Sequence, residues 1–117
     1  MAASSPVFSL FVTINFDSVE RREQFLEGIK PVAEYVQSSE PDTLAYEVLL
    51  SDKDPLQVLV LERYTDKENA YLKVHRSSAP FLAFKIFFQA MLNEGQLQIS
   101  GHSYLDSGVG FGDRNEP

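Results

Sequence analysis

The chain has 117 residues, 44% of them hydrophobic, and a formal net charge of −7. It contains no cysteine, which excludes a disulfide framework, iron–sulfur ligation and thiolate zinc sites. The acidic balance argues against nucleic acid as a partner, and no apolar run approaches the roughly twenty residues that span a bilayer. Residues 1–6 lack the basic and apolar regions of a signal peptide, so we expect a single soluble domain in the cytoplasm, without a membrane partner.

The beginning of the chain predicts one strand after a short disordered start. Residues 1–6 are small and polar, and we expect them to be disordered. In residues 7–16 every second position is apolar, which is the period of a strand. This uniformly apolar row consists of Phe8, Leu10, Val12, Ile14 and Phe16.

A helix is predicted next. Asp17 or Ser18 can cap its start, and the apolar positions from Phe25 to Val36 follow a helical stripe. Pro31 lies inside the stripe, where it lacks a backbone donor and crowds the preceding turn. We therefore expect a kink or two consecutive helices near Lys30.

Two further strands are predicted at residues 43–50 and 58–64. The turn between them, residues 51–55, is rich in polar residues and ends in proline, so the strands should form an antiparallel hairpin. Glu62 interrupts the apolar row of the second of these strands, and a carboxylate in such a row needs an explanation.

A second helical region follows directly. Thr65 and Glu68 have the spacing of a capping box, which predicts a helix that begins near Asp66. On an α-helix, His75 would lie one turn beyond Tyr71, beside an apolar stripe that also contains Ala70 and Val74.

The last predicted elements are an aromatic helix and a strand. Ser77 or Ser78 is the expected N-cap, and Pro80 is tolerated in the first turn. Apolar residues nearly encircle the helix over residues 81–92, so we expect it to be buried on more than one side. Residues 96–104 predict a strand, and the Gly- and Asp-rich tail, residues 106–117, is expected to be flexible unless a partner orders it.

The predicted order of elements, β-α-β-β-α-β, is the ferredoxin-like arrangement of the α+β class, here residues 7–105. Four antiparallel strands would carry both helices on one face. Both rows of the strands at residues 43–50 and 58–64 are largely apolar, so the other face also needs cover. We therefore expect a homodimer that associates through the sheet faces.

The run from Val58 to Phe84 resembles the antibiotic biosynthesis monooxygenase (ABM) domain family of the dimeric α+β barrel group. Members have a similar strand that ends in Glu-x-Tyr, a helix with His, and a Ser- or Thr-rich turn with proline into an aromatic helix. The matching positions are Glu62, Tyr64, His75, Ser77, Ser78, Pro80 and Phe81.

The resemblance implies a pocket between sheet and helices and, in many members, oxygenation of quinol or polyketide-like aromatics without metal or flavin. Such chemistry needs a base, oxyanion donors and a dry cavity, because the substrate supplies the electrons. His75 is the candidate base, with Glu62 to orient it. Tyr64 or Tyr71 would place the substrate oxygen of a small aromatic substrate. The expected wall of its ring is Phe81, Phe84 and Phe88, and we expect no cofactor and no metal.

Other interpretations stay open. His75 can be a hydrogen-bonded structural residue, Glu62 can pair with Arg63, Arg76 or a cation of a partner chain, and the aromatic stripe can be plain core. The same cavity could serve as a small-ligand isomerase or binding protein, or the chain could be a structural dimer module. Haem is disfavoured because the chain has no Trp and residues 81–92 contain no His, although His75 could in principle ligate iron.

Overall fold

The computed structural model describes residues 6–114 and contains the predicted order of elements. They are β1 (Phe8–Phe16), α1 (Val19–Ser39), β2 (Thr43–Leu50), β3 (Gln57–Tyr64), η1 (Lys67–His75), α2 (Ala79–Asn93) and β4 (Leu97–Leu105). The expected disorder of residues 1–6 concerns a segment that, apart from Pro6, lies outside the described residues. The ferredoxin-like α+β fold is confirmed.

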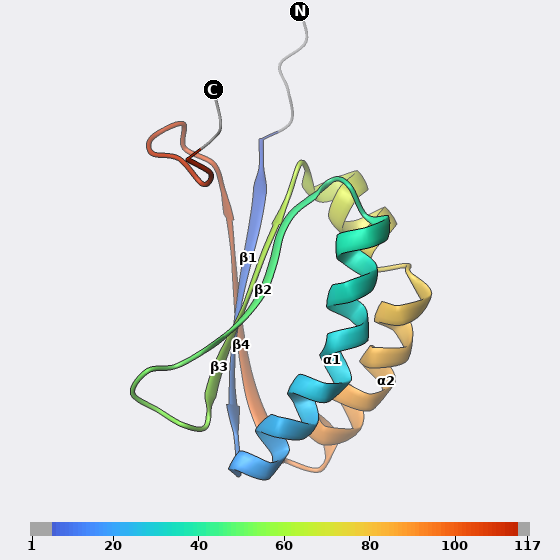
Figure 1. Ribbon diagram of the computed structural model, residues 1–117, viewed down its shortest axis with the longest axis vertical. Coiled ribbons are helices and arrows are strands. Elements are labelled where there is room, and N and C mark those ends of the chain that lie inside the picture. The colour runs from blue at the N-terminus through green and yellow to red at the C-terminus, as the bar shows by residue number, and fades with distance from the viewer. Residues whose placement is uncertain (1–5, 115–117) are drawn as a thin grey trace, which may run out of the picture.

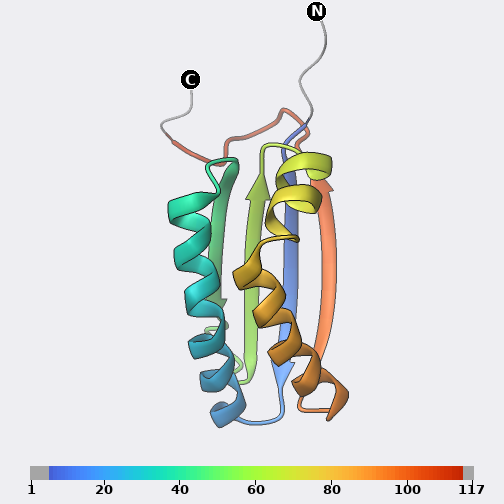
Figure 2. The same cartoon turned by 90° about the vertical axis from the view of Figure 1, so that its right-hand side faces the viewer.

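The four strands form one antiparallel sheet in the order β2-β3-β1-β4. All helices lie on one side of the sheet, and the other side is uncovered (Figure 1). Figure 2 shows α1 in front of β2, whereas β4 at the opposite edge has little cover. The apolar row of β1 faces the helices, because Ile14 and Phe16 are buried in the core with Phe25 of α1 and Val58 and Val60 of β3.

Helix α1 begins at the predicted cap. The Ser18 side chain accepts a hydrogen bond from the Arg21 N–H at 3.2 Å. The buried positions are Phe25, Ile29, Val32 and Val36, as the stripe predicted. The helix continues through Pro31 to Ser39 as one element, so the expectation of two consecutive helices is wrong.

Helix η1 differs from its prediction in cap and winding. Asp66, rather than Thr65, is the N-cap, and its carboxylate accepts from the N–H groups of Asn69 and Ala70. The helix has π-helical winding, in which hydrogen bonds join residues five apart, as between the Arg76 N–H and the Tyr71 carbonyl at 3.0 Å.

The wide winding explains which residues of η1 are buried. Ala70 and His75, five apart, are each 1% exposed, whereas Val74 is 40% exposed. In an α-helix with 3.6 residues per turn, residues 70 and 75 would lie about 140° apart around the axis. The predicted stripe therefore placed Val74 wrongly, because it assumed the α-helical period.

Helix α2 begins at Ser78, whose side chain accepts from the Phe81 N–H, and Pro80 lies in the first turn as predicted. The expectation that α2 is buried on several sides is wrong for the single chain. Met91 is its only fully buried residue, and Ile86 is 75% exposed. No helix among the described residues is long and apolar enough to cross a membrane.

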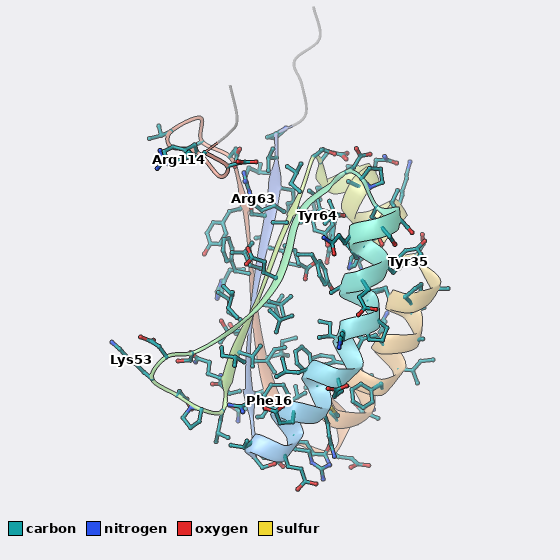
Figure 3. The ribbon with its side chains drawn as sticks, viewed as in Figure 1. Phe16, Tyr35, Lys53, Arg63, Tyr64 and Arg114 are labelled. Carbon is teal, nitrogen blue, oxygen red and sulfur yellow. The ribbon has the colours of Figure 1, made fainter. Side chains whose placement is uncertain are left out.

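After β4 the chain turns back toward the sheet. Asp106 forms an ion pair with Arg63 at 3.3 Å, and Figure 3 shows Arg63 beside this loop. Gly108 and Gly110 have φ angles of 86° and 88°, a region that glycine adopts without strain. The expected flexibility of residues 106–117 stays a prediction, and residues 115–117 of this segment lie outside the described residues.

Candidate active site

A cavity of about 290 Å³ lies between the helix-facing side of the sheet and helix α2. Its apolar wall comes from β1, β3, β4, α1 and α2, with Leu10, Val12, Ile14, Val60, Ile99, Phe25, Ile29, Phe81, Phe84, Phe88 and Leu92. Six polar residues also line it: Tyr46, Glu62, Tyr71, Arg76, Lys85 and Gln89. A mostly apolar hollow with a few convergent polar groups is the usual form of a small-molecule site.

Glu62 brings a buried carboxyl group to the cavity wall. It is 7% exposed, and its Oε1 accepts a short hydrogen bond from the Tyr64 hydroxyl. Burial raises the pKa of Glu62 from its ordinary value of 4.5 to about 7, although the Tyr64 hydrogen bond and the Arg76 charge oppose the shift. A carboxyl group with this pKa exchanges a proton near neutral pH.

His75 lies behind Glu62 and does not line the cavity. The imidazole is 1% exposed, and its Nδ1 is 3.0 Å from Glu40 Oε1. Its Nε2 has no hydrogen bond and is 3.9 Å from Glu62 Oε1. With Nδ1–H donating to the Glu40 carboxylate, Nε2 of the neutral ring points a lone pair toward Glu62.

The protonation of His75 follows from this environment. Burial lowers the pKa of His75 below its usual value, and the negative charge and hydrogen bond of Glu40 act in the opposite direction. The neutral imidazole is therefore the form that we expect at pH 7.

The predicted substrate-binding residues divide into two groups. Tyr71, Phe81, Phe84 and Phe88 line the cavity. Tyr64 is fully buried, and its ring centroid lies 5.6 Å from that of His75. In Figure 3 it lies between the sheet and α1, where its hydroxyl reaches Glu62 rather than the cavity.

One alternative for Glu62 is wrong. Arg63 points to the opposite side of the strand and pairs with Asp106, so it is not the partner of Glu62. Arg76 lies close enough to lower the pKa of Glu62, but no ion pair within 4.0 Å joins them.

The antibiotic biosynthesis monooxygenase family model matches residues 14–85, more than half of the chain and all of the Glu40, Glu62 and His75 cluster. The chain belongs to this family. A search of curated proteins finds no match.

Solved structures confirm the ABM fold. A candidate antibiotic biosynthesis monooxygenase from Nitrosomonas europaea aligns with a TM-score of 0.72 and 17% identity over 93% of this chain and 98% of that one. A second candidate, from Caulobacter crescentus, gives a TM-score of 0.67 and 20% identity over 87% and 92% of the two chains. A third candidate, from Bacteroides thetaiotaomicron, gives a TM-score of 0.67 and 22% identity over 93% of this chain and 96% of that one.

Sequence reasoning missed two residues of this ABM site. Glu40, at the C-terminus of α1, is 3% exposed and holds the His75 ring. Tyr46 on β2 lines the cavity, with its ring centroid 5.2 Å from that of His75. The spacing of 35 residues between Glu40 and His75 carries no periodic signal, so only the folded chain brings them together.

The donor groups of the site do not favour metal or haem. Within residues 6–114 no three His, Asp or Glu side chains are placed to hold a metal ion. The imidazole that the haem alternative would use does not line the cavity.

Proposed function

We propose that this ABM-family protein is a cofactor-independent monooxygenase that acts on a small aromatic or quinol-type substrate, with Glu62 and His75 central to proton transfer. The observation that carries the proposal is a buried carboxyl group with a pKa of about 7 on the wall of a mostly apolar cavity. A base of this strength suits a substrate that must lose a proton near neutral pH.

The arrangement favours an exchange of the roles expected from sequence. Glu62 lines the cavity and takes the phenolic proton, whereas His75 acts from behind it. The Tyr64 hydroxyl orients the Glu62 carboxylate, and the Glu40 carboxylate fixes the His75 ring. His75 is therefore a positioning residue whose free Nε2 can accept the proton from Glu62 in turn.

The reaction balances without a cofactor. Removal of the phenolic proton leaves an electron-rich phenolate, which reacts with O₂ at a ring carbon. One oxygen atom stays on the ring as the new carbonyl of a quinone, and the other leaves as water, so one O₂ is consumed for each phenol. The aromatic wall of Phe81, Phe84 and Phe88 would hold the ring and keep water away.

Oxygen consumption tests this proposal. With a panel of hydroquinones and hydroxynaphthalenes, we expect enzyme-dependent uptake of one O₂ per quinone formed, and transfer of one ¹⁸O atom from ¹⁸O₂ to the product. Turnover of none of these compounds above the rate without protein would contradict the proposal.

A second candidate is a small-ligand isomerase on the same cavity. A single acid–base group of pKa about 7 also suits proton transfer between carbon and oxygen of a hydroxyketone. Deuterium exchange into a hydroxyketone without O₂ uptake would favour this candidate over the oxygenase.

We also propose that the protein is a homodimer. On the uncovered side of the sheet the rings of Phe11 and Tyr104 pack edge to face at 5.5 Å, and Tyr104 is still 56% exposed. Leu49 on the same side is 39% exposed. Burial of this apolar face against a second copy would remove it from water.

A further inference from the structure

The charge of the cavity wall is opposite to that of the chain. The protein carries a formal net charge of −7, yet the cavity is lined by two cations, Arg76 and Lys85, and by one carboxyl group, Glu62. Arg76 is the C-cap of η1, and Lys85 lies in α2, so the two cations come from different elements. A concentration of positive charge at a cavity of an acidic protein favours an anionic ligand.

Neither cation forms a close ion pair within the part of the chain that the structure describes. Of the residues that the structure describes, no Asp or Glu lies within 4.0 Å of the charged groups of Arg76 or Lys85. Arg22 pairs with Glu23 and Arg63 pairs with Asp106, and neither of these ion pairs involves a cation of the cavity. Both cations therefore keep their capacity to bind an anion.

Arg76 is also held in place by aromatic rings. Its guanidinium carbon lies 6.0 Å from the ring centroid of Tyr71 and 5.6 Å from that of Phe81, and both rings line the cavity. Stacking restricts the guanidinium, so less freedom is lost when it binds a ligand. The same Phe81 ring contributes to the apolar wall, which places a charge next to the surface expected to bind an aromatic ring.

We propose that the ligand of this cavity is an aromatic molecule with an anionic substituent, such as a carboxylate, which Arg76 and Lys85 bind while Phe81, Phe84 and Phe88 contact the ring. This inference rests on the proposed function for its location, but it concerns binding and does not require oxygenation. The substituent is distinct from the phenolic group that faces Glu62.

The test uses matched probes that cannot be oxygenated as phenols. Isothermal titration of the full chain with 2-naphthoate and with 2-naphthamide compares an anion with a neutral molecule of nearly the same shape. We expect 2-naphthoate to bind about tenfold more tightly, because a charged hydrogen bond is stronger than a neutral one. Raising the salt concentration should weaken the binding of 2-naphthoate and leave the binding of 2-naphthamide nearly unchanged.

Variants assign the effect to the cavity cations. Lys85→Gln should weaken naphthoate binding about 3- to 10-fold without a change for naphthamide, and Lys85→Arg should restore it. Lys85 is exposed, so its replacement leaves the core intact. The control is Lys53→Gln, which removes the same charge from the β2–β3 turn at a residue that does not line the cavity, and should have no effect.

The outcomes separate the two proposals. Selective naphthoate binding that Lys85→Gln weakens and Lys53→Gln does not supports the inference even if no phenol consumes oxygen. Equal binding of both probes, binding of neither, or equal losses in Lys85→Gln and Lys53→Gln would overturn it, whatever the result of the oxygen assay.

Discussion

Glu62 combines burial with access to a cavity, and this combination sets its chemistry. Its carboxyl group is nearly hidden from solvent, so the charged form is disfavoured and the pKa rises to about 7. The sequence predicted that Glu62 was unusual, because it interrupts an apolar strand row. The sequence could not predict that Glu62 lines the cavity and His75 does not. The position of the His75 imidazole depends on the π-helical winding of η1, which the sequence pattern did not indicate.

The raised pKa of Glu62 makes stability depend on pH. The folded chain binds this proton more tightly than the unfolded chain, so the stability contributed by protonated Glu62 is lost as pH rises from about 4.5 to about 7. The amide of the Glu62→Gln variant stays neutral at every pH, so this variant does not lose stability in this way as the pH rises. We expect the free energy of unfolding of the variant, relative to wild type, to rise by about 3 kcal/mol between acidic and mildly alkaline pH. Urea unfolding at several pH values measures it, and a constant difference would contradict the assignment.

His75 is expected to contribute to stability as well as to activity. Its replacement by Ala removes a side chain that is 1% exposed and leaves the Glu40 carboxylate buried without this partner. We expect His75→Ala to lower the free energy of unfolding by about 2–4 kcal/mol.

The chain offers a control in Gln37, which is exposed on α1 and lies away from the uncovered side of the sheet. Gln37→Ala should change the free energy of unfolding by less than about 0.5 kcal/mol. If His75→Ala and Gln37→Ala both unfold at the same urea concentration as wild type, the contact between His75 and Glu40 does not stabilise the fold.

At the scale of elements, most boundaries could be predicted because local signals and the final fold agree. The N-caps Ser18 and Ser78 and the hairpin of β2 and β3 are coded by neighbouring residues. Helix η1 is the exception. Thr65 and Asp66 are both residue types that can cap a helix, and the sequence does not decide between them. The cap that is used, and the π-helical winding that follows it, depend on how Ala70 and His75 pack against the sheet. The neighbouring residues in the sequence do not encode this packing.

The cap of η1 gives a direct test at this scale. Asp66→Ala removes the acceptor for the N–H groups of Asn69 and Ala70, so we expect it to lower the Tm by a few degrees at neutral pH. These hydrogen bonds lower the pKa of Asp66, so the effect should disappear as the pH falls and the carboxylate is protonated. Thr65→Ala, measured by the same thermal scan, should have almost no effect on the Tm. A larger loss of Tm for Thr65→Ala than for Asp66→Ala would show that Thr65 is the cap.

At the scale of the whole molecule, the distribution of exposed apolar residues indicates incomplete burial. The sequence predicted an uncovered apolar sheet face correctly, but it overstated the burial of α2, because the apolar residues Leu82 and Ile86 lie on its exposed side. An apolar pattern around a helix does not show how many neighbours the helix has.

Association through the sheet can be tested by placing charge on it. Leu59 of β3 lies between Thr13 and Leu49 on the uncovered side, so Leu59→Lys should prevent face-to-face burial. Sedimentation velocity at micromolar concentration should show a dimer for wild type and a monomer for Leu59→Lys. Ile86→Lys, on the helix side, is the control and should stay dimeric. A monomeric wild type would contradict the proposed dimer.

The central claim is that Glu62 is the group that accepts the substrate proton. The most direct measurement is the initial rate of oxygen uptake as a function of pH, with the most rapidly oxidised phenol, for wild type, Glu62→Gln and the control Gln37→Ala. We expect kcat/KM of wild type and Gln37→Ala to rise through about pH 7, and Glu62→Gln to lose about 100-fold or more of the rate. A Glu62→Gln variant with the rate and pH profile of wild type would contradict the claim.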